Sequence, residues 1–274
     1  MGRFDGKVAF VTGGARGQGR SHAVNVAREG ADVVLMDLCD QIESVEYSMS
    51  TRADLEETAA LVEKHGQRAL PIQADVRDHA AVADAVRRGV SEFGHIDLVV
   101  ANAGIMPTTG AGSHELQAWT DTLDVMLTGV FYTVRETTQA MLDNRNGGAV
   151  VITGSTSSFR GVAYDVELLN PGQVGYGAAK HGVIAIMKNF ARALGQYGIR
   201  VNMVAPAGVR TPMVVNDAFS NLRASSPPGW MANAMNVDLA EPQDISDAVL
   251  WLLSAESRYV TGTAIPVDAG QLLC

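Results

Sequence analysis

The stretch "TGGARGQG", residues 12–19, decides the fold, because it joins an apolar run to a run with helical periodicity. The apolar run before it, "KVAFVTG" (7–13), is typical of a buried strand, and a helix is expected over 18–29. Its spaced glycines allow a tight turn, and the helix N-terminus offers N–H groups to a phosphate. The spacing is G-x-x-x-G-x-G, which a tight turn without a ligand also explains. The stretch predicts a strand–turn–helix unit that can cradle a dinucleotide.

The same alternation of strand and helix continues along the chain. Further apolar runs lie at 32–37, 68–75, 96–104, 148–155, 199–206 and 262–270. Helical periodicity follows at 53–65, 79–93, 115–143, 175–197 and 242–254. Continuous apolar runs favour strands that are buried on both faces, as in a parallel sheet. We therefore predict an α/β fold: a Rossmann-type, doubly wound, seven-stranded parallel sheet with helices on both faces, in a single domain over 1–274.

Three segments depart from this regular pattern. Two polar segments, 38–52 and 162–174, are longer than a compact connection needs and are predicted to be inserted loops. A third, near 212–236, mixes Pro, Gly, Ser, Met and Trp and is predicted to cover a substrate site. Within it, Trp230, Met231 and Met235 either line an apolar pocket or serve as plain packing.

Charge and composition exclude several functions. The net charge is −9, and the 21 Lys and Arg are scattered, which argues against nucleic acid and anionic membranes as partners. No apolar run approaches the roughly 18 residues of a membrane helix. Cys39 and Cys274 form no C-x-x-C pair, and the six histidines have no ligand spacing, so no metal is expected. A reducing, cytoplasmic setting is predicted.

An acidic residue ends the second predicted strand. Asp37 closes "VVLMDL", where a carboxylate can accept hydrogen bonds from both hydroxyls of an adenine ribose and would repel a 2′-phosphate. This favours NAD over NADP, although Arg16 is the kind of residue that binds such a phosphate. A helix N-cap or a solvated loop acid is the alternative for Asp37.

A tyrosine and a lysine stand four positions apart in "GYGAAKHG" (175–182). At helical spacing Tyr176 and Lys180 share one face. A nearby cation favours the phenolate and lowers a tyrosine pKa from about 10, although Y-x-x-x-K alone is common by chance. Ser155, in "ITGSTSS", ends another predicted strand, where ligands bind in doubly wound folds. The three side chains are candidates for proton transfer to or from a substrate oxygen.

The motifs "TGGARGQG", "ADVRD", "ANAG", "GSTSS", "YGAAK" and "NMVAPAGVRTPM", in that order, resemble those of the classical short-chain dehydrogenase/reductase family. The resemblance covers nearly the whole chain. It implies an NAD(P)-dependent oxidoreductase, homotetrameric or dimeric, that interconverts alcohols and carbonyls. Hydride would pass between nicotinamide C4 and a secondary alcohol or ketone carbon, with Tyr176 as acid/base, Ser155 orienting the oxygen and Lys180 tuning the tyrosine.

The resemblance also assigns cofactor contacts. They fall on Gly13, Arg16, Gly17, Gln18, Gly19, Asp37, Leu38, Asp75, Val76, Asn102, Ala103, Gly104, Tyr176, Lys180, Pro206, Val209 and Thr211. The long segment after Asp37 is similar to that of the carveol-dehydrogenase-like, mycofactocin-associated branch. In that branch the loop is thought to cover a tightly held NAD, which would make mycofactocin an external redox partner. A hydrophobic cyclic or terpenoid-like substrate, such as carveol, is expected.

The sequence departs from the family at two places. "LDVMLTGVF" places Met126 where the family has an asparagine that holds a proton-relay water, and methionine has no N–H to donate. The proton then travels through Asp124, Thr128 or water near 162–174, or it moves slowly. The alternative function is therefore a dinucleotide-binding protein with impaired turnover. The distance from Ser155 to Tyr176 is also longer than usual.

Overall fold

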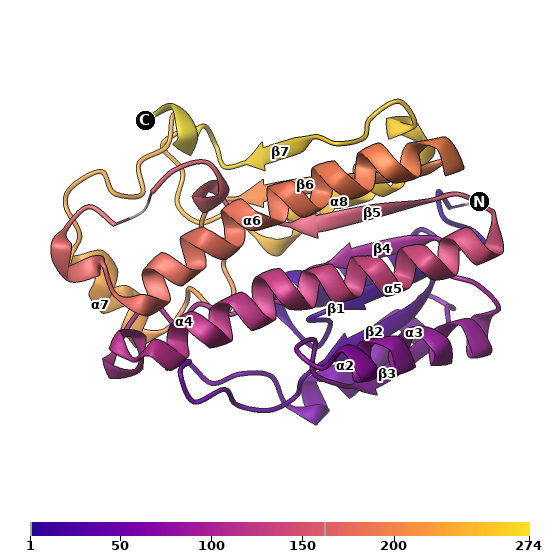
Figure 1. Cartoon of the computed structure of the whole chain (residues 1–274), viewed down its shortest axis with the longest axis horizontal. Helices are drawn as coiled ribbons and strands as arrows, with labels where there is room; N and C mark the ends of the chain where they lie inside the picture. The colour runs from indigo at the N-terminus through magenta and orange to yellow at the C-terminus, as the bar shows by residue number, and fades with distance from the viewer. Residues whose placement is uncertain (1, 162) are drawn as a thin grey trace.

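All seven predicted strands form one parallel sheet in the computed structural model, which describes residues 2–161 and 163–274. The strand order is β3-β2-β1-β4-β5-β6-β7 (Figure 1). The strands are β1 (Val8–Thr12), β2 (Asp32–Asp37), β3 (Ala69–Gln73), β4 (Leu98–Ala101), β5 (Gly148–Thr153), β6 (Ile199–Pro206) and β7 (Ala264–Val267). The predicted doubly wound, seven-stranded fold is confirmed.

Strand order reverses beside β1, which pairs with β2 on one side and with β4 on the other. Every residue of β1 is buried, as its unbroken apolar run predicted. Because all strands are parallel, their carboxyl ends meet at one edge of the sheet. Ligands of open α/β sheets bind outside that edge at the point of reversal.

Helices cover both faces of the sheet. They are α1 (Gly17–Arg28), α2 (Arg52–Glu63), α3 (His79–Phe93), α4 (Leu116–Leu123), α5 (Gly129–Asn144), α6 (Pro171–Leu194), α7 (Asp217–Ser225) and α8 (Pro242–Leu253). One buried cluster joins the sheet to α3, α5 and α6, and a second joins it to α1, α2 and α8. Figure 1 shows α5 and α6 running side by side across the nearer face. Within residues 2–161 and 163–274, no helix combines the length and apolarity needed to cross a membrane.

Three predicted boundaries are wrong. The helix expected over 115–143 is interrupted by a π-helical segment, Asp124–Thr128, between α4 and α5. Helix α6 begins at Pro171 rather than 175, because Asn170 caps it: its Oδ1 accepts from the Gln173 N–H at 2.8 Å. The predicted loop 162–174 therefore gives its last four residues to a helix, and Val162 lies outside the described residues. Segment 212–236 contains α7, which the sequence did not predict.

The inserted segment 38–52 has neither helix nor strand up to Thr51, the N-cap of α2. Despite its polar composition, it packs inward. Ile42 and Val45 are buried in the larger core cluster, and Tyr47 packs against that cluster. The insertion is therefore an anchored cover at the carboxyl edge of the sheet and not a solvated loop.

Candidate active site

A long crevice at the carboxyl edge of the sheet collects almost all the predicted cofactor residues. Those lining it are Gly13, Arg16, Gly17, Gln18, Gly19, Asp37, Leu38, Asp75, Val76, Asn102, Ala103, Gly104, Tyr176, Lys180 and Thr211. Pro206 and Val209 line an adjoining second cavity together with Ser155. Residues from six separate motifs thus meet at two connected hollows, which Tyr176 borders on both sides.

The glycine-rich turn requires glycine for local reasons. Gly13 and Gly17 have φ of +66° and +57°, which side-chain-bearing residues rarely adopt. A Cβ on Gly19 would lie 1.9 Å from the carbonyl oxygen of Gly13. The turn delivers α1 with an uncapped N-terminus: Arg16 makes no side-chain cap and the first turn holds no acid. The leading N–H groups and the helix dipole therefore suit a phosphate.

Asp37 is a buried carboxylate that ties three segments together. Its Oδ2 accepts from the Ala15 N–H at 2.9 Å, and its Oδ1 from the Ser50 hydroxyl at 2.6 Å and the Cys39 N–H at 3.2 Å. The side chain nevertheless borders the crevice. The alternatives of a helix cap and a solvated loop acid do not fit this burial, and the negative charge disfavours a second anion beside it.

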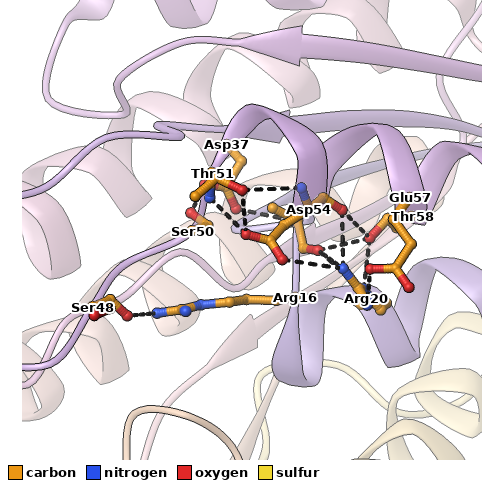
Figure 2. Close-up of polar contacts among 10 residues, drawn as sticks. Arg16, Arg20, Asp37, Ser48, Ser50, Thr51, Asp54, Glu57 and Thr58 are labelled. Carbon is orange, nitrogen blue, oxygen red and sulfur yellow. Dashed lines mark hydrogen bonds and ion pairs between the residues drawn. The ribbon is translucent and has the colours of Figure 1, made fainter.

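The glycine-rich turn is also joined to the inserted segment by a hydrogen bond. The Arg16 guanidinium donates to the Ser48 carbonyl at 2.5 Å, reaching across to the insertion (Figure 2). One turn further, Arg20 donates to the carbonyls of Ala15 and Asp54 and pairs with Glu57 at 2.8 Å. Arg16, predicted as a possible phosphate ligand, is in this structure the residue that joins the two walls of the crevice.

The middle of the crevice is fixed by contacts between β1 and β4. The Asn102 amide donates to the Thr12 carbonyl at 3.1 Å, and the Asn102 backbone N–H to the Thr12 hydroxyl at 3.0 Å. Beyond Asn102, a Cβ on Gly104 would lie 3.5 Å from the Met126 sulfur. Met126 is fully buried, so the family's asparagine position is here an apolar part of the crevice wall.

The predicted catalytic side chains come together at the junction of the two hollows. Ser155 hydrogen-bonds the Tyr176 phenol, which opposes the dominant effect, burial, that raises the pKa of Tyr176. Lys180 is buried, donates to the Thr153 carbonyl at 2.8 Å, and has its Nζ 5.8 Å from the centre of the Tyr176 ring. Burial lowers the pKa of Lys180 to about 8.

The expected tuning of Tyr176 by Lys180 therefore needs correction. The pKa of Tyr176 lies above its ordinary value, because loss of hydration outweighs the hydrogen bond from Ser155. The protonated phenol is thus the stable form at neutral pH. Lys180 lies beside the ring and is anchored to the backbone, a placement suited to holding a ligand in register.

The second cavity is walled by the predicted cover segment. Trp230 and Met231 line it, together with Met213 and Phe219. The Trp230 ring centroid lies 6.0 Å from that of Tyr164 and 6.1 Å from that of Phe219, so Trp230 joins segment 162–174 to α7. Trp230 and Met231 therefore line the pocket, whereas Met235 is exposed and lines neither hollow.

Sequence reasoning missed several residues of this region. Tyr47 lines the crevice from the insertion, and its buried hydroxyl accepts from the Met106 N–H at 3.2 Å. Burial raises its pKa. Arg160 and Gln271 line the second cavity. All three lie outside the periodic segments and the motifs, so no pattern marked them.

In the described part of the chain, no group of three or more His, Cys, Asp or Glu could hold a metal ion.

The fold and these two hollows define a dinucleotide-dependent oxidoreductase. The residues fit NAD: an uncapped helix faces a phosphate position, a carboxylate stands at the end of β2, and Tyr176 and Lys180 lie at the far end of the same crevice. A family model described as enoyl-(acyl carrier protein) reductase matches residues 13–271. The chain belongs to the short-chain dehydrogenase/reductase family and is an NAD-dependent oxidoreductase of the alcohol dehydrogenase type.

Individual relatives show which members of the family this chain is similar to. The chain is 39% identical over 287 residues to (−)-trans-carveol dehydrogenase of Rhodococcus erythropolis, with 100% of both chains covered. It is 34% identical to levodione reductase of Leifsonia aquatica, covering 98% of this chain and 95% of the relative. The crystal structure of carveol dehydrogenase from Mycobacterium avium in complex with NAD is 44% identical and has a TM-score of 0.91, covering 100% of both chains. The predicted resemblance to the carveol-dehydrogenase-like branch is confirmed.

Proposed function

We propose that this enzyme interconverts a secondary alcohol and a ketone on a hydrophobic cyclic, terpenoid-like compound, with NAD as its cofactor. One observation carries the proposal: Tyr176 borders both the dinucleotide crevice and the apolar second cavity. A substrate held in the second cavity would thus have its oxygen beside the phenol and its reacting carbon facing the crevice. The names of the relatives, carveol dehydrogenase and levodione reductase, support a cyclic substrate.

Each of the three side chains has a separate role in this proposal. Tyr176 gives its phenolic proton to a ketone oxygen or, in the reverse direction, takes the hydroxyl proton after it has itself lost its proton to become the phenolate. Ser155, which hydrogen-bonds the phenol, orients the substrate oxygen. Lys180, whose ammonium donates a hydrogen bond to the Thr153 carbonyl, binds the nicotinamide ribose in the crevice. NAD, when bound, supplies the hydride acceptor or donor.

A test of the catalytic roles compares two tyrosines. Tyr176→Phe should lower kcat with cyclic alcohols or ketones by more than about 10²-fold, because general acid–base catalysis contributes about that much. NAD binding, measured by calorimetry, should stay close to that of the unchanged protein. Tyr197→Phe, which removes an exposed phenol, is the matched control and should retain full activity. Activity surviving in Tyr176→Phe would overturn the mechanism.

We further propose that NAD is preferred over NADP, because Asp37 would stand beside a 2′-phosphate. Asp37→Asn removes this negative charge and keeps one side-chain oxygen, which can accept from the Ala15 N–H, while its NH2 can donate to the Ser50 hydroxyl oxygen. The ratio of kcat/KM for NAD to that for NADP should fall by about tenfold or more. An unchanged ratio would mean that another residue selects the cofactor.

We also propose that NAD is held tightly and is reoxidised by an external partner such as mycofactocin. The Arg16–Ser48 hydrogen bond supports this, because it joins the two walls of the crevice. Native mass spectrometry of the purified protein should show retained NAD. Arg16→Met should release it, whereas Arg258→Met, at an arginine outside both hollows, should not. We expect a cytoplasmic homotetramer or dimer, to be measured by light scattering.

The alternative of a dinucleotide-binding protein with impaired turnover finds no support among these relatives, which are named as dehydrogenases and reductases. The presence of Ser155, Tyr176 and Lys180 at one junction also favours an enzyme. Replacement of the family asparagine by Met126 bears on the rate of proton exchange and leaves the acid/base itself in place.

A further inference from the structure

Arg160 brings a positive charge to the wall of the second cavity. It follows the short 3-10 turn η3 (Thr156–Ser158), five residues after Ser155, so the element that carries the oxygen-orienting hydroxyl also positions the guanidinium. Among the described residues that line this cavity, Arg160 is the one charged side chain. The chain has 30 acidic residues against 21 Lys and Arg, yet no acid is found among the described residues that line the cavity.

The guanidinium has no partner within the described part of the chain. Its Nε is buried without a hydrogen bond, and none of the described carboxylates forms an ion pair with it. Other partly buried arginines, Arg20 and Arg77, are paired with acids at 2.8 and 2.7 Å. A buried N–H without an acceptor costs free energy, which an acceptor brought by a ligand would offset.

The remaining walls of the cavity set the shape of such a ligand. Its apolar side is formed by Met213, Phe219, Leu222, Trp230 and Met231. The hydroxyls of Ser155 and Tyr176 supply the reacting end. The cavity therefore offers an apolar middle, a proton-transfer site and one separate cation.

We propose that the substrate is a cyclic hydroxy or keto acid whose carboxylate binds Arg160. This inference rests on the proposed alcohol–ketone chemistry and names the substrate class for that same site. A planar guanidinium matches a carboxylate through charge-assisted hydrogen bonds. One arginine with no second cation suits a singly charged group better than a phosphate, which carries up to two negative charges. A neutral terpenoid alcohol would leave the Arg160 Nε without an acceptor.

The kinetic test uses two substrates that differ only in charge. They are 3-hydroxycyclohexanecarboxylate and 3-hydroxycyclohexanecarboxamide, each assayed with NAD in the unchanged protein and in variants. The acid should have the higher kcat/KM, by about ten- to a hundredfold, the range expected for a hydrogen bond to a charged group. Arg160→Met should remove that preference, and Arg160→Lys should keep part of it.

A second arginine serves as control for the loss of charge. Arg87→Met removes an exposed guanidinium on α3, outside the cavity, and should leave the acid-to-amide ratio unchanged. Arg160 lies on a loop and makes no described hydrogen bond, so Arg160→Met should fold, which circular dichroism checks. The inference would be overturned if kcat/KM for the acid were close to that for the amide in the unchanged protein, or if the preference for the acid persisted in Arg160→Met. Either result would leave the proposed function standing.

A binding measurement makes the inference independent of turnover. Calorimetry with cyclohexanecarboxylate and cyclohexanecarboxamide, on the protein saturated with NAD, reports on recognition without hydride transfer. The carboxylate should bind about tenfold tighter or more, and Arg160→Met should abolish the difference. If neither hydroxy compound is oxidised but this difference is seen, the proposed function fails and carboxylate recognition by Arg160 holds. Equal binding of the two probes overturns the inference.

Discussion

Lowering the pH from 7 to 5 should cost the folded chain about 2 kcal/mol through one side chain, His22. This histidine lies on α1, directly after the glycine-rich turn, and is 0% exposed. Its Nδ1 lies 2.8 Å from the Ser246 hydroxyl of α8, and its Nε2 is buried with no hydrogen-bond partner. Burial lowers its pKa to about 3.

The sign follows from the difference in bound protons. In the unfolded chain the imidazole titrates near pH 6.5. Between pH 3 and 6.5 the unfolded state binds a proton that the folded state does not, so stability falls as the pH falls. At pH 5 the shortfall spans about 1.5 pKa units at about 1.4 kcal/mol each, or about 2 kcal/mol.

Urea unfolding at pH 7 and pH 5 measures this loss. His22→Gln keeps an amide near Ser246 but cannot titrate in this range. Between pH 7 and pH 5, the free energy of unfolding should therefore fall less for His22→Gln than for the unchanged protein. The difference between the two losses should be about 2 kcal/mol. His65→Gln, at an exposed histidine, is the control and should preserve the full loss. If His22→Gln loses as much stability as the unchanged protein, the buried imidazole is not the cause.

Further predictions concern two residues of the crevice, Met126 and Gly19, and one residue of α6, Gly177. Met126→Asn should raise the rate of ketone reduction with added NADH, measured by absorbance, if proton relay limits turnover; an unchanged rate would mean that the proton leaves by another route. The same change should lower the melting temperature, since it buries an amide in an apolar wall at a cost of about 1–3 kcal/mol. Gly19→Ala should abolish NAD binding, because its Cβ would lie 1.9 Å from a backbone oxygen. Gly177→Ala, where an added Cβ would meet no atom within 4 Å beyond its chain neighbours and the nearby backbone of its own helix, should instead stabilise α6 by roughly 0.5–1 kcal/mol in thermal unfolding. A loss of stability there would contradict the helix geometry.

The sheet could be predicted because its inner strands are buried on both faces. Each of the seven apolar runs became a strand, although the edge strands β3 and β7 are only partly buried. The break between α4 and α5 was not predictable in the same way. A π-helical segment changes hydrogen-bond partners without requiring particular residues, and "DVMLT" has the periodicity of an ordinary helix.

The residues of the candidate site also differ in whether the sequence could predict them. Gly19, Asp37 and Ser155 could be found because each belongs to a motif at the end of an apolar strand, where parallel topology brings ligands. Tyr47 and Arg160 could not, because they stand in irregular segments whose path depends on tertiary contacts. The pKa of Tyr176 was predicted in the wrong direction for a related reason: sequence spacing shows the neighbouring cation and does not show the loss of water.

The contacts around Lys180 narrow the route by which a proton can leave the site. One of its three N–H groups is committed to the Thr153 carbonyl, which accepts hydrogen bonds but has no proton to pass on. Beyond it, the Thr153 hydroxyl donates to the Asn102 side-chain oxygen at 3.3 Å, and Asn102 donates to the Thr12 carbonyl. Both sets of contacts therefore end on a backbone carbonyl, which has no proton to pass on. Since Met126 lines the neighbouring wall with a thioether, the predicted catalytic groups that carry a proton to exchange are the remaining N–H groups of Lys180 and the hydroxyls of Ser155 and Tyr176.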